Sequence, residues 1–287
     1  MRNAEPITGS ITYHGEGPFW DSRSGQLLCV DMLSAEILAI DSTGNFSRHK
    51  VPSRAATVIR RRASGGFVIA TERELIGSDE DFSVFDLIAD IRPANGCRTN
   101  DGACDPFGGF VIGTMAYDER AGGGAVYRIA PDHQVREILA PVSISNGLQW
   151  SADGARAFHV DTPTRCVDVF RIDPESGSWF DRRTHIRIEG SAGYPDGMAI
   201  DDEDGLWIAL WAGGVIQHYD AAGRLVEEVA VPTVTQPSSC AFGGDDGNIL
   251  YITTSRQGLA DRDQPLAGSL FAFCTQSRGA EVWQFGG

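Results

Sequence analysis

The stretch Asn146-Gly-Leu-Gln-Trp-Ser-Ala-Asp-Gly154 runs into Ala155-Arg-Ala-Phe-His-Val-Asp161. It contains a polar residue, a short apolar strand, a turn rich in Asp and Gly, and a second apolar strand. The same order of features recurs at Glu16–Asp31, Asn100–Gly113 and Asp196–Ala209. Two strands joined by such a turn predict a β-hairpin. Because the hairpin recurs along the chain, the sequence indicates a repeat architecture.

Two weaker copies, Thr57–Ala70 and Ser239–Thr253, complete a set of six. The turn glycines are Gly25, Gly65, Gly108, Gly154, Gly205 and Gly247, at successive intervals of about 40, 43, 46, 51 and 42 residues. Intervals of this length are typical of propeller blades built from four strands.

Alternating strands also follow most of these hairpins. They are Glu36–Asp41, Gly124–Ile129, Val167–Asp173, Gly214–Asp220 and Gly268–Phe273. No segment has the pattern of a long amphipathic helix. We therefore predict an all-β fold, a six-bladed β-propeller with four-stranded antiparallel blades that occupies residues 1–287 as a single domain. No Trp-Asp dipeptide closes each unit, which weakens an interpretation as a scaffold of the WD40 type.

Charge and hydropathy exclude several classes of partner. The 287 residues include 24 basic and 39 acidic side chains, a net charge of −15. Such a chain repels phosphate backbones and anionic headgroups, so we expect no nucleic-acid or membrane partner. No apolar run approaches the roughly 20 residues of a membrane span. Residues 1–6 lack the apolar core of a signal peptide, so a cytoplasmic protein is expected.

Cysteine spacing favours free thiols over disulfides or a zinc site. The chain has no Cys-x-x-Cys pair, and most of its cysteines lie in apolar runs. This pattern predicts buried free thiols in a reducing compartment. The cysteines are Cys29, Cys97, Cys104, Cys166, Cys240 and Cys274.

The first polar residue of each hairpin predicts a metal site. In a propeller the first strand of each blade is innermost, so equivalent positions of that strand form a ring around the axis. These positions hold Glu16, Ala56 or Thr57, Asn100, Asn146, Asp196, and Ser238 or Ser239. Any one Asn or Asp is explained by its preference for turns. Four oxygen-bearing side chains in register are better explained by a divalent cation, because two carboxylates crowded together are costly to desolvate.

All the predicted ligands are hard oxygens, which favours calcium, magnesium, manganese or ferrous iron, with zinc also possible. Three or four protein ligands leave positions for water and substrate, as in a catalytic site. Arg98 lies two residues before Asn100 and so on the same side of an extended strand, where it could contact substrate or form a surface salt bridge. Tyr117 and Asp118 are expected on the loop after the second strand of unit three, and Trp211 either lines the pocket or packs between blades.

Five motifs together resemble the gluconolactonase, regucalcin or senescence marker protein family. They are Gly15-Glu16-Gly17-Pro18, Arg98-x-Asn100-Asp101-Gly102, Gly113-Thr114-Met115, Ser145-Asn146-Gly147-Leu148 and Tyr194-Pro195-Asp196-Gly197. The resemblance implies a divalent metal, calcium first, held by Glu16, Asn146 and Asp196. It implies hydrolysis of a sugar lactone with Asp196 as ligand and general base, and substrate contacts at Arg98, Asn100 and Asp118. Two departures are His14, where an aliphatic residue is expected, and Tyr117.

The implied reaction is the opening of a cyclic ester, in which the metal polarises the carbonyl and a water near Asp196 attacks. The expected partner is a small sugar lactone, and the chain is expected to be a monomer or weak homodimer. Three alternatives are a phosphotriesterase on the same ring, a non-enzymatic calcium-binding regulatory propeller with a closed ring, and a strictosidine-synthase-like enzyme. Whether Asn100 binds the metal or only the substrate stays open.

Overall fold

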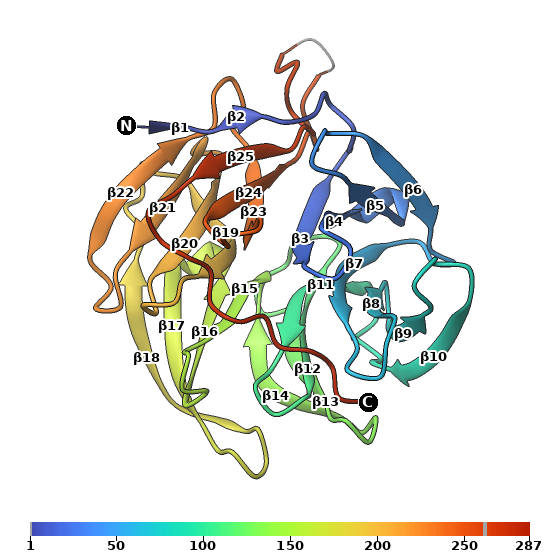
Figure 1. Ribbon diagram of the computed structural model, residues 1–287. Coiled ribbons are helices and arrows are strands. Elements are labelled where there is room, and N and C mark those ends of the chain that lie inside the picture. The colour runs from blue at the N-terminus through green and yellow to red at the C-terminus, as the bar shows by residue number, and fades with distance from the viewer. Residues whose placement is uncertain (1, 261–262) are drawn as a thin grey trace.

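The computed structural model describes residues 2–260 and 263–287, and across these residues the strands form six sheets around a central axis (Figure 1). Each of the first four sheets is a run of four consecutive antiparallel strands, with the first strand innermost. Blade 1 contains β3 (Gly15–Asp21), β4 (Gln26–Asp31), β5 (Glu36–Ile40) and β6 (Phe46–Lys50). Blade 2 contains β7 (Ala56–Arg61), β8 (Phe67–Thr71), β9 (Glu74–Ser78) and β10 (Phe85–Asp90). Blade 3 contains β11 (Cys97–Cys104), β12 (Phe110–Ala116), β13 (Gly124–Ile129) and β14 (Val135–Val142). Blade 4 contains β15 (Ser145–Trp150), β16 (Arg156–Asp161), β17 (Cys166–Ile172) and β18 (Trp179–Arg187).

The last two blades are completed by the N-terminal segment. Blade 5 contains β19 (Tyr194–Ile200), β20 (Leu206–Trp211), β21 (Val215–Tyr219) and β22 (Leu225–Ala230), with β1 (Arg2–Asn3) added parallel to β22. Blade 6 contains β23 (Pro237–Gly243), β24 (Ile249–Thr254) and β25 (Phe271–Cys274), and β2 (Glu5–Pro6) is its fourth strand. The six-bladed, four-stranded antiparallel fold predicted from the repeat is confirmed. The two N-terminal strands were not predicted.

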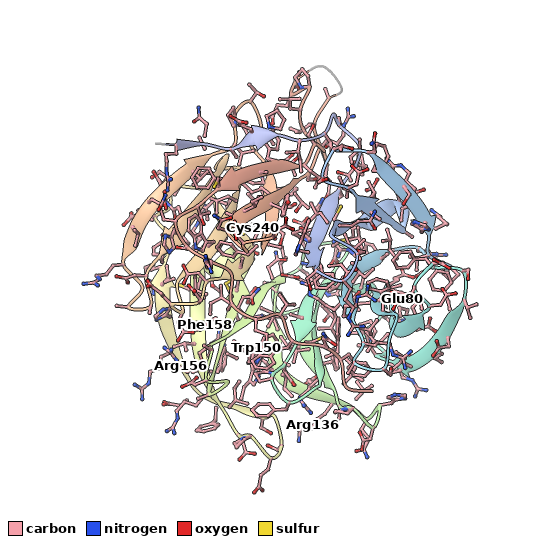
Figure 2. The ribbon with its side chains drawn as sticks, viewed as in Figure 1. Glu80, Arg136, Trp150, Arg156, Phe158 and Cys240 are labelled. Atoms are coloured by element: carbon pink, nitrogen blue, oxygen red, sulfur yellow. The ribbon has the colours of Figure 1, made fainter. Side chains whose placement is uncertain are left out.

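Burial falls from the axis outward, and the sequence follows it. Every residue of the inner strands β7 and β11 is buried, although β11 contains polar side chains. The outer strands β6 and β18 carry charged residues and are mostly exposed. An inner strand covered on both faces requires small or apolar residues except where polar side chains meet near the axis, whereas an outer strand has one solvated face. In Figure 2, Trp150 and Cys240 lie on inner strands near the middle of the ring, and Arg136 lies at its periphery.

Six hydrophobic clusters hold the ring together, and each joins two neighbouring blades. The cluster between blades 1 and 2, for example, packs Phe19 and Ile37 against Ile59 and Ile69. Corresponding clusters follow at each of the other interfaces, and the one between blades 6 and 1 includes Leu270 and Leu27. Because the apolar contacts lie between sheets, no blade can bury its own apolar faces without its neighbours.

Each inner strand contains a β-bulge where it pairs with the second strand of its blade. The pairing shifts between Glu16 and Phe19 in blade 1, and equivalent shifts occur in all five other blades. A bulge adds an unpaired residue and re-aims the neighbouring side chains. Gly17 and Gly147 follow the bulged anchors with φ of 54° and 34°. A Cβ atom at Gly147 would lie 2.9 Å from the Asp196 carbonyl oxygen, so glycine lets adjacent inner strands approach closely.

The C-terminal segment crosses one end of the channel, as the red coil ending at C shows in Figure 1. Phe285 is fully buried in the cluster between blades 2 and 3, and its amide donates to the Arg61 carbonyl oxygen at 3.0 Å. A cavity of about 60 Å³ remains beneath this segment, lined by Arg60 and Trp150 among others. The channel is therefore nearly closed at the end formed by the C-terminal halves of the inner strands.

Helical structure in the described residues is limited to two short 3-10 turns, η1 (Met32–Ser34) and η2 (Thr162–Thr164). No helix in this part of the chain is long and apolar enough to cross a membrane. All six cysteines are free, as predicted, and five of them are buried; Cys274 is exposed, because it ends β25 at the surface.

Candidate functional site

The open end of the channel forms a cavity of about 520 Å³ at the N-terminal ends of the inner strands. Four predicted anchors lie together in its wall: Glu16, Asn100, Asn146 and Asp196, one each from blades 1, 3, 4 and 5. We call this set the inner tier. Each member lies at the bulge of its strand, so the bulge turns its side chain toward the axis. The cavity is large enough for a small organic ligand.

The remaining two blades contribute no side chain to the inner tier. The Thr57 hydroxyl lies 2.9 Å from that of Thr99, and the Ser238 hydroxyl donates to the Gly15 carbonyl oxygen at 2.5 Å. Neither residue lines the cavity. These hydroxyls instead connect neighbouring inner strands, so the blades on either side of blade 1 supply no oxygen ligand to the ring.

Two of the inner-tier side chains are carboxylates buried where charge is costly. Burial raises the pKa of Glu16 to about 8, and repulsion from Asp101 adds to this, while the Gly17 amide and the Arg98 charge oppose it. Burial also raises the pKa of Asp196 well above its ordinary value, and the charges of Glu16 and Asp101 raise it further. Ionising both carboxylates at this position is therefore costly, and a cation near them would lower that cost.

The two amides and Arg98 form a hydrogen-bonded chain beside these carboxylates. Asn100 Nδ2 donates to Asn146 Oδ1 at 2.8 Å, and Arg98 Nη1 donates to Asn100 Oδ1 at 2.6 Å. Asn146 Nδ2 in turn donates to Thr162 Oγ1 at 2.9 Å. The chain fixes which way each amide points and leaves a lone pair on Asn146 Oδ1 for a further partner. Asn100 therefore orients Asn146, and its own oxygen is engaged by Arg98.

Arg98 is 6% exposed and lines the cavity. Within the described residues it forms no ion pair with a carboxylate, and its Nη1 also donates to the Thr99 carbonyl oxygen at 2.8 Å. The alternative of a surface salt bridge is wrong, because Arg98 is enclosed by β11 and the cavity wall. Its guanidinium carbon lies 5.9 Å from the centre of the Tyr117 ring.

The donor set fits a hard divalent cation. Glu16 and Asp196 bring two negative charges and Asn146 a neutral oxygen, the ligand types that calcium and magnesium prefer. No group of three His, Cys, Asp or Glu side chains able to hold a metal occurs in the described residues, so a cation here would depend on amide oxygen and water as well. The raised pKa values of the two carboxylates are the structural reason to expect one.

The loop after β12 departs from the sequence prediction. Asp118 does not reach the cavity: its carboxylate accepts from Arg120 Nη1 at 2.9 Å, and its side chain is 65% exposed. Its neighbour Glu119 lines the cavity instead. Tyr117 also lines it, with its hydroxyl donating to Glu72 Oε1 at 2.7 Å. Burial and this hydrogen bond raise the pKa of Tyr117 to about 12. The conformation of this loop determines which of the two adjacent acids, Asp118 or Glu119, faces the cavity, and the sequence pattern did not predict that conformation.

A second set of cavity residues lies two positions before each anchor. It consists of His14, Arg98, Ile144 and Tyr194, and we call it the outer tier. In an extended strand residues two apart share one side, so each outer-tier residue lies above its anchor toward the mouth. From the sequence, only Arg98 was placed by this two-residue spacing. The same spacing before the other three anchors identifies His14, Ile144 and Tyr194. Trp211 lines the cavity too, with its ring 5.8 Å from that of His14.

Comparisons with known proteins agree with this fold. The sequence model of the family described as SMP-30/Gluconolactonase/LRE-like region matches residues 14–256. The chain is 34% identical to regucalcin from Gallus gallus over 276 residues, 92% of this chain and 91% of that protein. A crystal structure of a calcium-binding protein, regucalcin, from Agrobacterium tumefaciens is similar, with a TM-score of 0.93 and 26% identity over 99% of this chain and 97% of that one. A luciferin-regenerating enzyme has a TM-score of 0.85 at 29% identity, with the same coverage of both chains.

Proposed function

The chain belongs to the SMP-30/gluconolactonase/LRE-like family, and we propose that it is a divalent-metal-dependent hydrolase that opens a sugar lactone to the aldonic acid. One observation carries the proposal. Two buried carboxylates with raised pKa values lie at the base of an open cavity of about 520 Å³, beside a buried arginine. An ion held only for structure would not need an open cavity of this size above it.

Glu16, Asn146 and Asp196 would hold the cation. When bound, a divalent cation supplies Lewis-acid polarisation of the lactone carbonyl and charge stabilisation at its oxygen. Calcium is the first choice, and magnesium, manganese, ferrous iron or zinc would also suit oxygen ligands.

The side chains have separate tasks in the reaction. Asp196 accepts a proton from the water whose oxygen bonds to the carbonyl carbon. The ring C–O bond then breaks, and the departing oxygen takes up a proton to become a hydroxyl. Arg98 binds sugar hydroxyls and fixes the face that is attacked. Asn100 accepts from a further hydroxyl through the second lone pair of its Oδ1, because its Nδ2 already donates to Asn146 and to the Ser145 carbonyl oxygen. Asp118 stays a predicted substrate contact, to be tested against Glu119. Six free thiols support a reducing compartment such as the cytoplasm.

The test is a panel of aldonolactones run with metal-stripped and metal-restored protein. Because these lactones also open spontaneously, the rate is proton release in excess of a no-enzyme control at fixed pH. We expect activity that disappears on stripping and returns with one equivalent of calcium or another divalent ion. A fluorophosphate ester run in parallel separates a lactonase from a phosphotriesterase. Turnover of the ester with no turnover of any lactone would overturn the proposal.

A non-enzymatic calcium-binding function is the second candidate, because the similar Agrobacterium tumefaciens protein is named a calcium-binding protein. Under this alternative calcium would bind tightly and no lactone would be opened at saturating metal. The same panel therefore decides between the two, provided that calcium binding is measured on the same preparation by calorimetry.

A further inference from the structure

The outer tier divides the mouth of the cavity into two chemically different sides. His14 and Arg98, from blades 1 and 3, present nitrogen donors. Ile144 and Tyr194, from blades 4 and 5, present apolar and aromatic surface. A ligand that fits has oxygens along one edge and C–H groups on the other. Arg98 is already placed by the resemblance, whereas His14 stands where an aliphatic residue was expected.

His14 is held rigidly. Its backbone amide donates to Asp31 Oδ1 at 3.0 Å, and its carbonyl oxygen accepts from the Met32 amide at 2.9 Å. Its ring nitrogen Nδ1 lies 2.7 Å from Ser255 Oγ, and its ring meets Trp211 edge to face at 73°. The His14 side chain therefore has a fixed direction, which a residue that determines substrate specificity requires.

The hydrogen bonds around Ser255 favour one of the two neutral tautomers of His14. Ser255 is fully buried, and its Oγ accepts from the Gln257 amide at 3.0 Å. Its hydroxyl proton is free to donate to His14 Nδ1, and with Ser255 as the donor the neutral imidazole carries its own proton on Nε2. No residue in the described part of the chain is hydrogen-bonded to Nε2. Because the ring lines the cavity, this donor has only a ligand or water to bind.

The position of His14 identifies the part of a substrate that it can reach. It lies two residues before Glu16 on one side of an extended segment, about 6.5–7 Å away along the strand. An imidazole there reaches the ligand atoms next to those held at the inner tier. We infer that His14 is a specificity-determining residue, which donates from Nε2 to the hydroxyl on the carbon next to the lactone carbonyl. The preferred substrates are then 2-hydroxy lactones. The inference rests on the proposed function.

The test compares a 2-hydroxy aldonolactone with its 2-deoxy analogue. In the parent protein kcat/KM for the hydroxy lactone should exceed that for the analogue by roughly 10–100-fold, because a site built to bind a hydroxyl discriminates against its absence. His14→Leu should lower kcat/KM for the hydroxy lactone by about that factor and leave the analogue within about threefold. His14→Gln, which keeps an N–H donor, should recover part of the preference. His185→Leu, at a half-buried histidine outside the cavity, is the matched control and should change neither.

Two measurements do not depend on turnover. Calorimetry with the corresponding sugar lactams, which keep the ring and carbonyl but resist opening, should show the same 2-hydroxyl preference and its loss in His14→Leu, with calcium affinity unchanged. Nitrogen NMR should show His14 protonated on Nε2 in the parent and a mixture of tautomers in Ser255→Ala. An equal loss on both lactams in His14→Leu would overturn the inference. If the protein opened neither lactone, the proposed function would fail, and the lactam measurements would still decide the role of His14.

Discussion

Glu16 and Asp196 lie in one buried site, and of the neighbouring charges that of Glu16 raises the pKa of Asp196 most strongly. Removing that charge tests whether the inner tier binds a cation. Glu16→Gln should weaken binding of a divalent ion by about tenfold or more, because one of two negative ligands is lost. Calorimetric titration of metal-stripped protein measures the change. Glu36→Gln, at a partly exposed carboxylate paired with Arg48 on the surface, is the matched control and should bind like the parent.

Asp196 is predicted to have a second role as the base. Asp196→Asn keeps the shape and an oxygen ligand but removes the charge and the basicity. We expect kcat at saturating metal to stay about 10²–10⁴-fold below that of the parent, the usual contribution of a positioned base. Excess proton release at several metal concentrations measures it. Full recovery of kcat with added metal would leave Asp196 as a ligand only.

Asp118 and Glu119 are adjacent acids with different environments, so they form a natural comparison. Glu119 lines the cavity, whereas the Asp118 carboxylate is paired with Arg120 at the surface. Glu119→Gln should raise KM for a lactone by roughly 3–30-fold, because a hydrogen bond to a substrate hydroxyl is weakened. Asp118→Asn should leave KM within about twofold. The opposite order would return the substrate contact to Asp118, as the family resemblance implies.

At the scale of strands, the repeat was sufficient to predict the six hairpins and the ring of anchors, because alternation and turn residues are local signals. The bulges were not predicted, since they depend on how the first two strands of a blade pair. The only sequence feature that marks three of these bulges is the glycine that follows Glu16, Asn146 and Asp196. The orientation of Glu119 rather than Asp118 into the cavity could not be deduced, because loop backbone geometry is not periodic.

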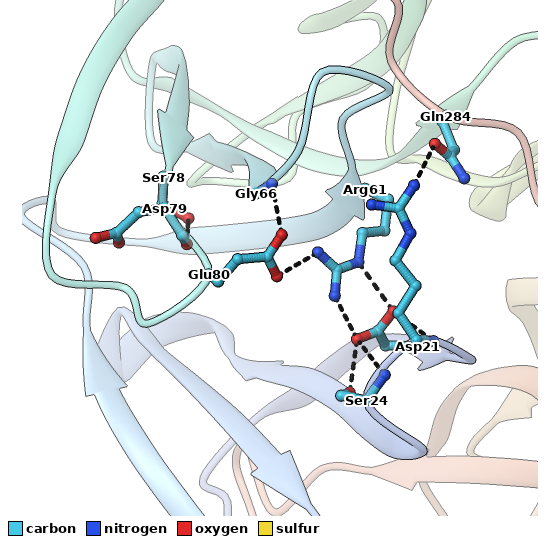
Figure 3. A network of polar contacts seen from close by, with 9 residues as sticks. Asp21, Ser24, Arg61, Gly66, Ser78, Asp79, Glu80 and Gln284 are labelled. Carbon is cyan, nitrogen blue, oxygen red and sulfur yellow. Dashed lines mark hydrogen bonds and ion pairs between the residues drawn. The ribbon is translucent and has the colours of Figure 1, made fainter.

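Blades 1 and 2 are joined by an ion-pair network at the closed end of their inner strands (Figure 3). Arg61 at the end of β7 donates to both carboxylate oxygens of Asp21, at 2.9 and 2.6 Å, and to Glu80 Oε2 at 2.5 Å. Arg61 and Asp21 are almost fully buried, and Glu80 also accepts from the Gly66 amide at 2.9 Å. A bidentate pair of this kind fixes the angle between two blades as well as their contact.

Arg61→Met should lower the free energy of unfolding by about 3–5 kcal/mol, because it leaves the Asp21 carboxylate buried without its cation. Burial acts to raise the pKa of Asp21, but hydrogen bonds from Arg61 and Ser24 and the Arg61 charge outweigh it and hold that pKa below its ordinary value. The stabilisation is therefore complete above pH about 4 and is lost as pH falls through the depressed pKa.

Urea unfolding of parent and variant at pH 7 and at pH about 3 measures the difference. The destabilisation should be largest at pH 7 and smaller at pH 3. Arg224→Met removes an exposed pair with Asp220 and is the matched control, with no measurable change expected. A destabilisation by Arg61→Met that did not depend on pH would mean that lost packing of the side chain on Phe67, rather than the ion pair, explains it.

At the scale of the whole molecule, a propeller must join its last blade to its first, and here the N-terminal segment does so. The Ala4 amide donates to the Ala230 carbonyl oxygen at 2.8 Å, and the Ile7 amide to that of Leu270 at 2.9 Å. Ala4 itself is buried in the cluster between blades 5 and 6. Strands of two residues have no periodicity to detect, and their partners lie more than 200 residues away, so this closure could not be predicted from the local pattern.

The closure leads to a prediction about stability that is independent of the site. A variant lacking residues 2–6 loses β1 and β2 and exposes the edges of β22 and β25. It should be destabilised by on the order of 2–4 kcal/mol, since several backbone hydrogen bonds of about 1 kcal/mol each are removed together with the burial of Ala4.

The open edges should also favour self-association, because an unpaired strand is a template for another chain. Arg2→Ala keeps both strands and removes an exposed ion pair with Glu227 and a contact with the Phe273 ring, so it should cost far less stability than the truncation. Thermal unfolding and sedimentation measure the two effects, and calcium titration well below the midpoint should show an intact inner tier. A truncated chain that unfolds with the parent's midpoint would show that the six interfaces between blades hold the ring closed without these strands.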